Sequence, residues 1–402
     1  KTITQLEHVL ARPDTYIGSV DREHDKHWVI KTSNQSGDDS NVSMIQKQLS
    51  IIPGLYKIFD EIVVNAIDQC QVDTTVDSIR IDVNKEEGFI SVLNTGTGIP
   101  VQIHDEYKIY IPELIFGELL TSENYDDSVK RTTGGRNGYG AKLANIFSTK
   151  FMVETLDIAS GKKYSQTWTN NMREKSLPSI TSSAAKKGYA KFTFWPDFAR
   201  FNMESLEQDM IDLFQKRAYD VCACTKSNIS VFYNSKQLSV KTFEKYIDLY
   251  IGSKTENPRV CISNSRWDVA VCASSDSYKQ VSFVNGISTS QGGQHVDYVL
   301  KTIINKLNDY ISTQPKYKNL DIKSQYIKDH MFVFVKSTLE NPTFSSQTKT
   351  ECTSKWGTFG SKPDINEEFI KKIIKLGILD EAVALAKHKE LRELSKTDGK
   401  KR

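Results

Sequence analysis

A glycine-rich stretch at residues 132–142 is the feature that most constrains this chain. Four glycines and a lysine fall within nine residues there, directly before Leu143, Ile146 and Phe147, which are spaced as on a helix. Glycine has no Cβ atom, so its backbone NH groups can approach an anion closely, and a helix N-terminus adds free NH groups and the positive end of a dipole. The fold must therefore lead a loop into the start of a helix, an arrangement typical of a phosphate-binding cradle.

The familiar phosphate motifs do not fit this stretch. A P-loop needs Gly-Lys-Ser/Thr after an apolar strand, but Lys142 is followed by Leu143. A Rossmann turn needs a further glycine three residues after the second, and none follows Gly140 at that distance. Taken alone, the stretch is compatible with a phosphate site or with a solvated lid, and its neighbours must decide.

An amphipathic helix is predicted over residues 55–69, where apolar residues recur at helical spacing. Glu61, Asn65 and Asp68 fall at i, i+4 and i+7, so they stack on the remaining face. A polar stripe of this kind is usually solvated. Asparagine and aspartate are weak helix formers in a helix interior, however, so a chemical role explains them better than helix propensity does.

Alternating apolar residues predict two strands, over residues 79–83 and 90–92, joined by a turn. The second strand runs into Asn94 and two glycines, Gly96 and Gly98. Such an ending brings backbone close to a ligand, although an ordinary loop has the same composition.

Together and in this order, the three segments resemble the GHKL ATPase superfamily, which includes DNA gyrase B, MutL-type mismatch repair proteins, heat-shock chaperones and histidine kinases. Longer blocks are similar to the ATPase region of eukaryotic-type DNA topoisomerase II, a type IIA enzyme: residues 12–19, 53–61, 121–127, 134–143 and 346–349. The resemblance extends over nearly the whole chain. It implies an α+β fold in which a GHKL (Bergerat) α/β sandwich at residues 1–240 is followed by a ribosomal S5-like transducer domain at 241–402 with a C-terminal helical exit.

The resemblance also implies an ATP site with magnesium as cofactor. Glu61 would be the general base that polarises the attacking water, and Asn65 would hold the magnesium ion at the phosphates. Asn94 would recognise the adenine edge, because an amide offers both a donor and an acceptor. Gln347 and Lys349 would be catalytic and ATP-binding residues that reach the terminal phosphate from the second domain. The other matching ATP-binding residues are Asp68, Ser122, Asn124, Gly135, Arg136, Asn137, Gly138, Tyr139, Gly140, Ala141 and Lys142.

The sequence departs from the family pattern near the site. Glu123 stands where the family usually has a second serine, and Gln69 replaces the usual asparagine after Asp68. Neither position is the expected base, metal ligand or lysine, so the roles above are unaffected.

In the second domain, strands are predicted over residues 267–271, 281–285 and 331–335, with a long helix whose apolar residues span 296–307 and a helical tail over 369–394. Lys316, Lys318 and Lys323 follow the long helix, where the family has a lysine-rich loop facing DNA. Uncharged and acidic residues interrupt this loop here, so DNA contact and a solvated loop both stay open. Any DNA contact would be independent of base sequence and sensitive to salt.

By resemblance, the chain is the ATP-binding and hydrolysing gate module of the enzyme, in which ATP drives homodimer formation and domain rotation coupled to strand passage through double-stranded DNA by the full-length enzyme. The DNA-cleavage parts expected of the whole enzyme are absent from this sequence, so it should hydrolyse ATP without cutting DNA. A nuclear location follows from the eukaryotic-type resemblance, with a large DNA virus as the alternative source. Two other classes stay open: a non-topoisomerase GHKL machine, and a clamp in which ATP serves only to join two copies.

Composition is consistent with these expectations. The net charge of +3 is too small to indicate a nucleic-acid binder by itself. No run of 18 apolar residues occurs, so no membrane partner is expected. The six cysteines lack the usual zinc spacing, which favours free thiols in a reducing compartment.

Overall fold

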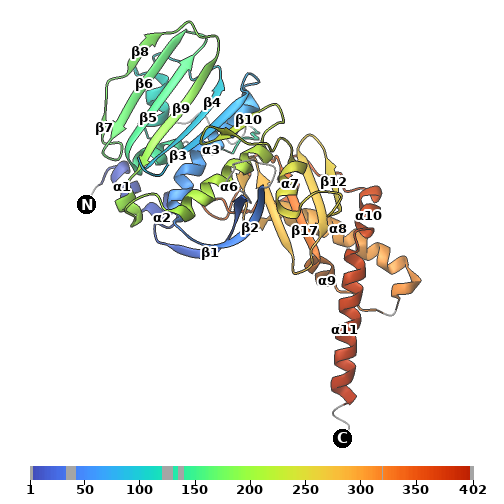
Figure 1. Ribbon diagram of the computed structural model, residues 1–402. Coiled ribbons are helices and arrows are strands. Elements are labelled where there is room, and N and C mark those ends of the chain that lie inside the picture. Colours follow the sequence, from blue (N-terminus) through green and yellow to red (C-terminus); the bar gives the residue numbers. More distant parts are fainter. Residues whose placement is uncertain (1–2, 33–41, 120–129, 135–139, 319, 399–402) are drawn as a thin grey trace. The chain divides into compact units, whose positions relative to one another are not determined.

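The computed structural model describes residues 3–32, 42–119, 130–134, 140–318 and 320–398 (Figure 1). The chain divides into two compact units, residues 1–250 with 285–287, and residues 251–284 with 288–402. Each unit contains both helices and strands, as the predicted α+β class requires.

A nine-stranded sheet forms the frame of the first unit (Figure 1). Its strands are β3 (Ser78–Asn84), β4 (Phe89–Gly96), β5 (Ser148–Asp157), β6 (Lys162–Thr169), β7 (Glu174–Lys175), β8 (Ser179–Ser182), β9 (Gly188–Pro196), β10 (Ser230–Tyr233) and β11 (Lys236–Gln237). Their order is β11-β10-β3-β4-β9-β5-β6-β7, and β8 pairs with β6. Only β3 and β10 run parallel, so the sheet is mixed.

Three helices, α3 (Pro53–Val72), α5 (Gly140–Ile146) and α6 (Gln208–Cys224), pack against this sheet. Helix α3 contacts both other helices and β4, and its predicted apolar stripe is buried, as Leu55, Phe59 and Ile62 illustrate. Burying such side chains contributes roughly 1.5–3 kcal/mol each, which fixes the rotation of α3 and hence the direction of its polar face. The remaining elements of this unit are α1 (Gln5–Ala11), α2 (Pro13–Tyr16), β1 (Glu23–Thr32), β2 (Val42–Ile51), α4 (Ile111–Gly117), a 3₁₀ helix (Phe198–Phe201) and α7 (Phe243–Ile251).

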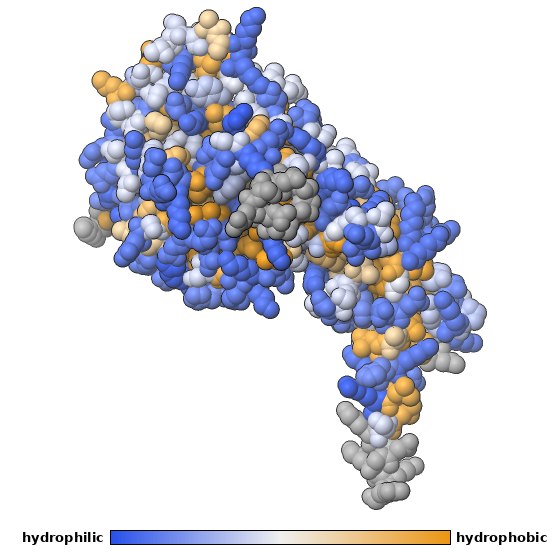
Figure 2. Space-filling view, in the orientation of Figure 1, coloured by the Kyte–Doolittle hydropathy of each residue, from blue (hydrophilic) through white to orange (hydrophobic). Residues whose placement is uncertain are grey.

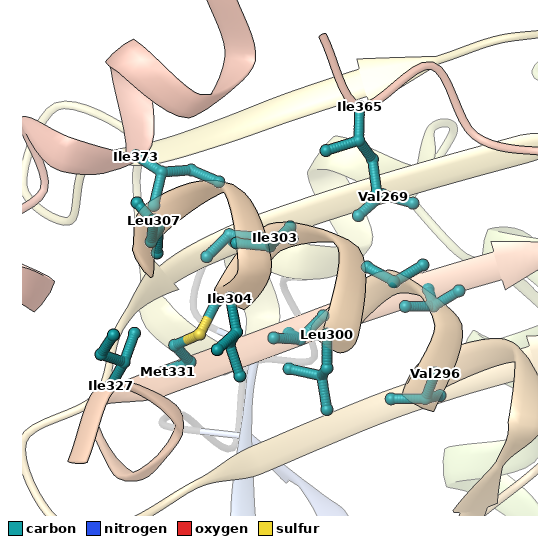
Figure 3. Close-up of a cluster of buried hydrophobic side chains, with 14 of the residues drawn as sticks. Val269, Val296, Leu300, Ile303, Ile304, Leu307, Ile327, Met331, Ile365 and Ile373 are labelled. Atoms are coloured by element: carbon teal, nitrogen blue, oxygen red, sulfur yellow. The ribbon is translucent and has the colours of Figure 1, made fainter. Parts of the chain in front are cut away.

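A five-stranded sheet forms the second unit, in the order β12-β13-β17-β14-β15. The unit contains β12 (Arg259–Ser263), β13 (Trp267–Ala273), β14 (Lys279–Val284), β15 (Ile287–Ser288), β16 (Gly292–Gly293), α8 (Gln294–Thr313), α9 (Ser324–Asp329), β17 (Met331–Ser337), β18 (Glu351–Cys352), α10 (Glu367–Ile374) and α11 (Ile378–Asp398). The predicted strands correspond to β13, β14 and β17. The apolar face of α8 meets the sheet and α10 in one buried cluster, which includes Leu300, Ile303, Val269 and Met331 (Figure 3).

The tail differs from its prediction. The continuous helical run expected over residues 369–394 is wrong at 375–377, where the chain turns between α10 and α11. Gly377 has a φ of 82°, in the left-handed region that glycine enters without steric cost, so it ends the first helix. Apolar periodicity alone did not mark this break.

Within the described part of the chain, no helix is both long and apolar enough to cross a membrane, and no group of three or more His, Cys, Asp or Glu side chains could hold a metal ion. All six cysteines are free. The face shown in Figure 2 is mostly hydrophilic, with apolar residues in scattered patches.

Candidate functional site

Helix α3 carries the three polar residues that the sequence singled out. Glu61 is buried, with 4% of its surface exposed, whereas Asn65 and Asp68 are half-buried. The apolar side of the helix is fixed in the core, so these three side chains share the opposite side in steps of one turn. Glu61, the first residue of the predicted polar stripe, is therefore buried and not solvated.

A buried ion pair holds Glu61. Lys57, one turn earlier on α3, pairs with the Glu61 carboxylate, and only 3% of Lys57 is exposed. Removing two charges from water is costly, and a buried charge without its partner costs more, so the pairing with Lys57 offsets part of the cost of burying the Glu61 carboxylate. Sequence analysis missed Lys57, although a lysine at i−4 on a largely buried helix was a usable signal.

The end of the glycine-rich stretch lies against Glu61. Gly140 is the first residue of α5, and a Cβ atom at this position would overlap the Glu61 carboxylate. A larger residue there would displace the Glu61 carboxylate from this position. Lys142, in the first turn of α5, is buried, and burial lowers the pKa of its ammonium to about 8, while Glu118 opposes this shift only weakly. A buried ammonium next to a helix start is suited to an anionic ligand.

The start of the stretch is anchored to α3. The backbone NH of Gly134 donates to both carboxylate oxygens of Asp68, at 2.8 and 3.0 Å. A Cβ atom on residue 134 would lie 2.7 Å from Val64 Cγ1, so this glycine is also enclosed. Asp68, predicted as an ATP-binding residue, thus orients the loop itself.

Asn94 lies near the end of β4, a strand that contacts α3. Asn94 is buried, with 6% exposed, and its Nδ2 donates to the carbonyl of Thr95 at 3.1 Å. Beyond it, the Thr97 backbone NH donates to Asp73 at 2.7 Å. Burial raises the pKa of Asp73, but hydrogen bonds from Thr75 and Thr97 outweigh it and bring the pKa to about 2. The loop after Asn94 is therefore fixed by an ionised carboxylate that the sequence analysis did not find.

Several predicted residues lie outside the described residues: Ser122, Asn124, Gly135, Arg136, Asn137, Gly138 and Tyr139. Ala141 is buried in α5 next to Gly140. Asn65, Asp68, Gly140 and Glu61 are thus brought together around α3, and Asn94 stands at the end of a sheet strand that contacts the same helix.

Gln347 and Lys349 belong to the second unit. Lys349 is 8% exposed and has a φ of 59°, a left-handed conformation that is uncommon outside glycine. Its NH donates to the Ser346 carbonyl at 3.1 Å. Two residues later, β18 pairs in parallel with β16, directly before α8.

The three lysines predicted to contact DNA also lie in the second unit. Lys316 lies in a short 3₁₀ turn (Pro315–Tyr317) after α8, Lys318 follows this turn, and Lys323 precedes α9. The Lys316 ammonium lies 4.6 Å from the ring centre of Tyr317, and a hydrogen bond with that tyrosine raises its pKa. Lys323 lies 3.9 Å from Asp321.

Comparison with known proteins identifies the family and the fold. Residues 51–200 match the model of the family described as histidine kinase-, DNA gyrase B-, and HSP90-like ATPase, and residues 227–398 match that of DNA gyrase B. The crystal structure of the ATPase region of Saccharomyces cerevisiae topoisomerase II superposes with a TM-score of 0.88 at 43% identity, covering 96% of this chain and 98% of that one.

The chain belongs to the DNA topoisomerase II family. DNA topoisomerase 2 of Arabidopsis thaliana is 46% identical over 99% of this chain, and that of Drosophila melanogaster is also 46% identical. The chain spans 27% of the length of each of these relatives. The family and structure matches exclude the alternative of a non-topoisomerase GHKL protein. They confirm the predicted fold, a GHKL domain followed by a transducer domain. The ATPase domain of Thermus thermophilus gyrase B, at 16% identity and a TM-score of 0.62, shares the fold alone.

Proposed function

We propose that this chain is the ATP-binding and hydrolysing gate module of a type IIA DNA topoisomerase. The observation that carries the proposal is the buried Glu61 carboxylate, paired with Lys57 and bordered by Gly140 at the start of α5. A buried, ion-paired carboxylate beside the first residue of a helix that follows a glycine-rich stretch suits a base that orients water toward a terminal phosphate.

The chain's own residues fit ATP and magnesium. Asn65 presents an amide oxygen, a hard ligand of the kind magnesium accepts, one turn from Glu61. When bound, magnesium would neutralise phosphate charge. Lys142 and the NH groups around Gly140 would bind the phosphates, and Asn94 would recognise the adenine edge. The matching residues outside the described part, from Ser122 to Tyr139, complete the proposed set.

We extend the proposal to the second unit by resemblance. Gln347 and Lys349 would contact the terminal phosphate, with the Lys349 ammonium stabilising charge as it develops. The left-handed backbone of Lys349 supports this role, because strained conformations of non-glycine residues cluster at functional sites. In the same scheme, residues 1–240 form the nucleotide domain and 241–402 the transducer.

We also propose how the chain assembles and what it acts on. The chain would form a homodimer on binding ATP, and the full-length protein would act on double-stranded DNA in the nucleus. Lys316, Lys318 and Lys323 would contact DNA phosphates. Names of the relatives support a DNA substrate.

Glu61→Gln tests the proposal. The variant is nearly isosteric but cannot accept a proton, so ATP binding should persist while hydrolysis falls roughly 10²-fold or more. Glu113→Gln is the matched control, because Glu113 is also buried and paired with a lysine, Lys175, at 2.7 Å. Wild-type turnover in Glu61→Gln, or an equal loss in the control, would remove Glu61 from the mechanism.

Light scattering tests the assembly separately. A non-hydrolysable ATP analogue should convert monomer into a two-fold dimer, whereas ADP should not. A protein that stays monomeric with the analogue contradicts ATP-driven pairing for this chain.

A further inference from the structure

A turn at residues 170–172 connects β6 to β7 in a conformation that most residues avoid. Asn170, Asn171 and Met172 have φ values of 52°, 56° and 65°, so three consecutive non-glycine residues are left-handed. Such a backbone is sterically unfavourable and persists only where the surrounding structure holds it. Turns usually lie in solvent, but only 6% of Asn171 is exposed. The contacts of this buried asparagine should therefore explain the turn.

Asn171 caps the end of α5. Its Nδ2 donates to the carbonyl of Ile146, the last residue of α5, at 2.9 Å, and to Asp197 Oδ2 at 3.1 Å. Its own NH donates to the Ser148 carbonyl at 3.2 Å. The last carbonyls of a helix have no partner within the helix, and burying them without one is costly. The strained turn thus presents a donor to the C-terminal end of α5.

Two further hydrogen bonds hold the same end of the helix. Ser148 Oγ donates to the Ala144 carbonyl at 2.6 Å, and the Asp197 NH donates to the Phe147 carbonyl at 2.9 Å. Helix α5 has seven residues and is only about 10 Å long. A helix this short is not stable by itself, so contacts with the rest of the first unit determine where it lies.

The opposite end of α5 lies against the Glu61 carboxylate. A Cβ atom on Gly140, the first residue of α5, would lie 2.9 Å from Glu61 Cδ. Helix α3, which carries Glu61, is held separately, because the fully buried Arg217 donates from Nε to the neighbouring Asp60 at 2.6 Å. With α3 fixed in this way, the separation of Gly140 from Glu61 depends on the position of α5.

We propose that Asn171 is a positioning residue for the nucleotide site and acts on Glu61 through α5. The inference rests on the function proposed above. Asn171 holds the last turn of α5, and the first residue of the same helix borders the carboxylate. Without this cap the last turn frays and α5 shifts, so Gly140 no longer confines Glu61. A catalytic group that is displaced by about 1 Å loses much of its effect, so Asn171 contributes to the rate of hydrolysis.

Asn171→Gly tests this role. Glycine keeps the positive φ of the turn and removes the donor to Ile146. The kcat for ATP should fall roughly tenfold, measured at a temperature at which thermal unfolding shows the variant to be fully folded. Adenosine affinity, measured by calorimetry, should be unchanged, because Asn94 lies on β4 and not on α5. Ser148→Ala removes a different donor from the same end of α5 and should also lower kcat, by a smaller factor.

Combining Asn171→Gly with Glu61→Gln shows whether the effect passes through Glu61. If it does, the double variant should hydrolyse ATP as slowly as Glu61→Gln alone, since a carboxamide has no base function that could be misplaced. A residue with a purely structural role would lower the melting temperature and leave the kcat of the folded protein unchanged.

Asn234→Gly is the matched control. Asn234 is another left-handed asparagine, with a φ of 46°, and its Oδ1 accepts a hydrogen bond from the Val83 NH at 2.7 Å. It lies between β10 and β11, whereas α5 packs on β5 and β9. Both kcat and adenosine affinity should therefore stay as in the wild type. This control separates the loss of a left-handed asparagine from the loss of the cap on α5.

The outcomes are distinguishable. If Glu61→Gln hydrolyses ATP at the wild-type rate, the proposed function fails. If Glu61→Gln is slow but Asn171→Gly and Ser148→Ala both keep the wild-type kcat, the positioning role is overturned. An equal fall of kcat when Asn171→Gly is introduced into the wild type and into Glu61→Gln would also overturn it, because Asn171 would then act independently of the carboxylate.

Discussion

The two units bury different kinds of side chain. Among the described residues, the first unit buries many charged groups: Lys57, Asp60, Glu61, Glu113, Lys142, Asp157, Arg217 and Asp220. In the second unit, the buried charged residues of the described part are Arg259 and Lys349, and the cluster around α8 consists of aliphatic and aromatic side chains with one cysteine.

This difference is consistent with the nucleotide site proposed for the first unit. Buried charges lose hydration, and well-packed apolar residues of the same volume are often equally or more stabilising. Charged residues retained next to α3 are therefore better explained by a ligand than by stability. The second unit follows the opposite principle, because an apolar core specifies one rigid packing.

The largest effect is expected from breaking the charged interior at Arg217. Arg217→Met leaves the Asp60 carboxylate buried without its ion-pair partner, so unfolding in urea should show a loss of about 3–5 kcal/mol. The double variant Arg217→Met with Asp60→Leu removes both charges and should recover most of this loss. If the single and double variants are equally unstable, packing and not charge accounts for the effect.

A cavity in the apolar interior of the second unit should lower the free energy of unfolding slightly less than the Arg217 variant does. Ile303 is fully buried on α8, and Ile303→Ala should lower the free energy of unfolding by about 3 kcal/mol. Because no charge is involved, the loss should be the same at low and high salt and from pH 6 to pH 8. A marked salt dependence would contradict the comparison between the two interiors.

His295 sharpens the comparison, because it is a polar exception in the second unit. It is fully buried beside Thr289, whose Oγ1 lies 3.2 Å from Nε2, and burial lowers the pKa of its imidazole to about 3. The unfolded chain takes up a proton near pH 6.5 and the folded chain does not. The stability contributed by neutral His295 is therefore complete above pH 6.5 and lost as the pH falls toward 3, by about 2 kcal/mol at pH 5.

Comparing the wild type with His295→Gln between pH 7 and pH 5 measures this contribution. The glutamine variant can still bond Thr289 but does not titrate, so its stability should fall less by about 2 kcal/mol over that range. Identical pH profiles would mean that His295 is protonated in the folded protein.

The smallest effect concerns Lys142. With a pKa of about 8, its ammonium loses the proton between pH 7 and pH 9, while phosphate binding favours the charged form. Affinity for an ATP analogue should therefore fall several-fold, or about 1 kcal/mol, over this range. Lys142→Arg, which stays charged, should flatten the profile, and adenosine binding should not change with pH in either protein.

Local patterns predicted much of the fold. The apolar periodicities of α3 and α8 and the short apolar runs of β13 and β17 predicted these elements, because the helices bury one face and the strands are buried over most of their length. The break at Gly377 was missed, since apolar spacing continues across it. The order of the nine strands could not be read from local sequence, because pairing such as that of β3 with β10 joins segments about 150 residues apart.

The same limit applies to the site. Glu61, Asn65 and Asp68 share one helix face, so their spacing was sufficient to predict that they lie on the same side of α3. The contact of Asn285 with Thr133 spans 152 residues and has no local signature. The ion pair of Lys57 with Glu61 did have one, the i, i+4 spacing, but lysines on helices usually face water.

The pairing of β16 with β18 joins the segment after Lys349 to the start of α8. β18 begins two residues after Lys349, and β16 runs directly into the first turn of α8, where Gly293 fits against the backbone of Cys352. Helix α8 has 20 residues, so it is about 30 Å long, and Lys316 and Lys318 follow its far end. A tilt of about 10° at the Lys349 end would displace these lysines by about 5 Å. A small shift at the Lys349 end of α8 would thus become a movement of about one helix pitch at the other end.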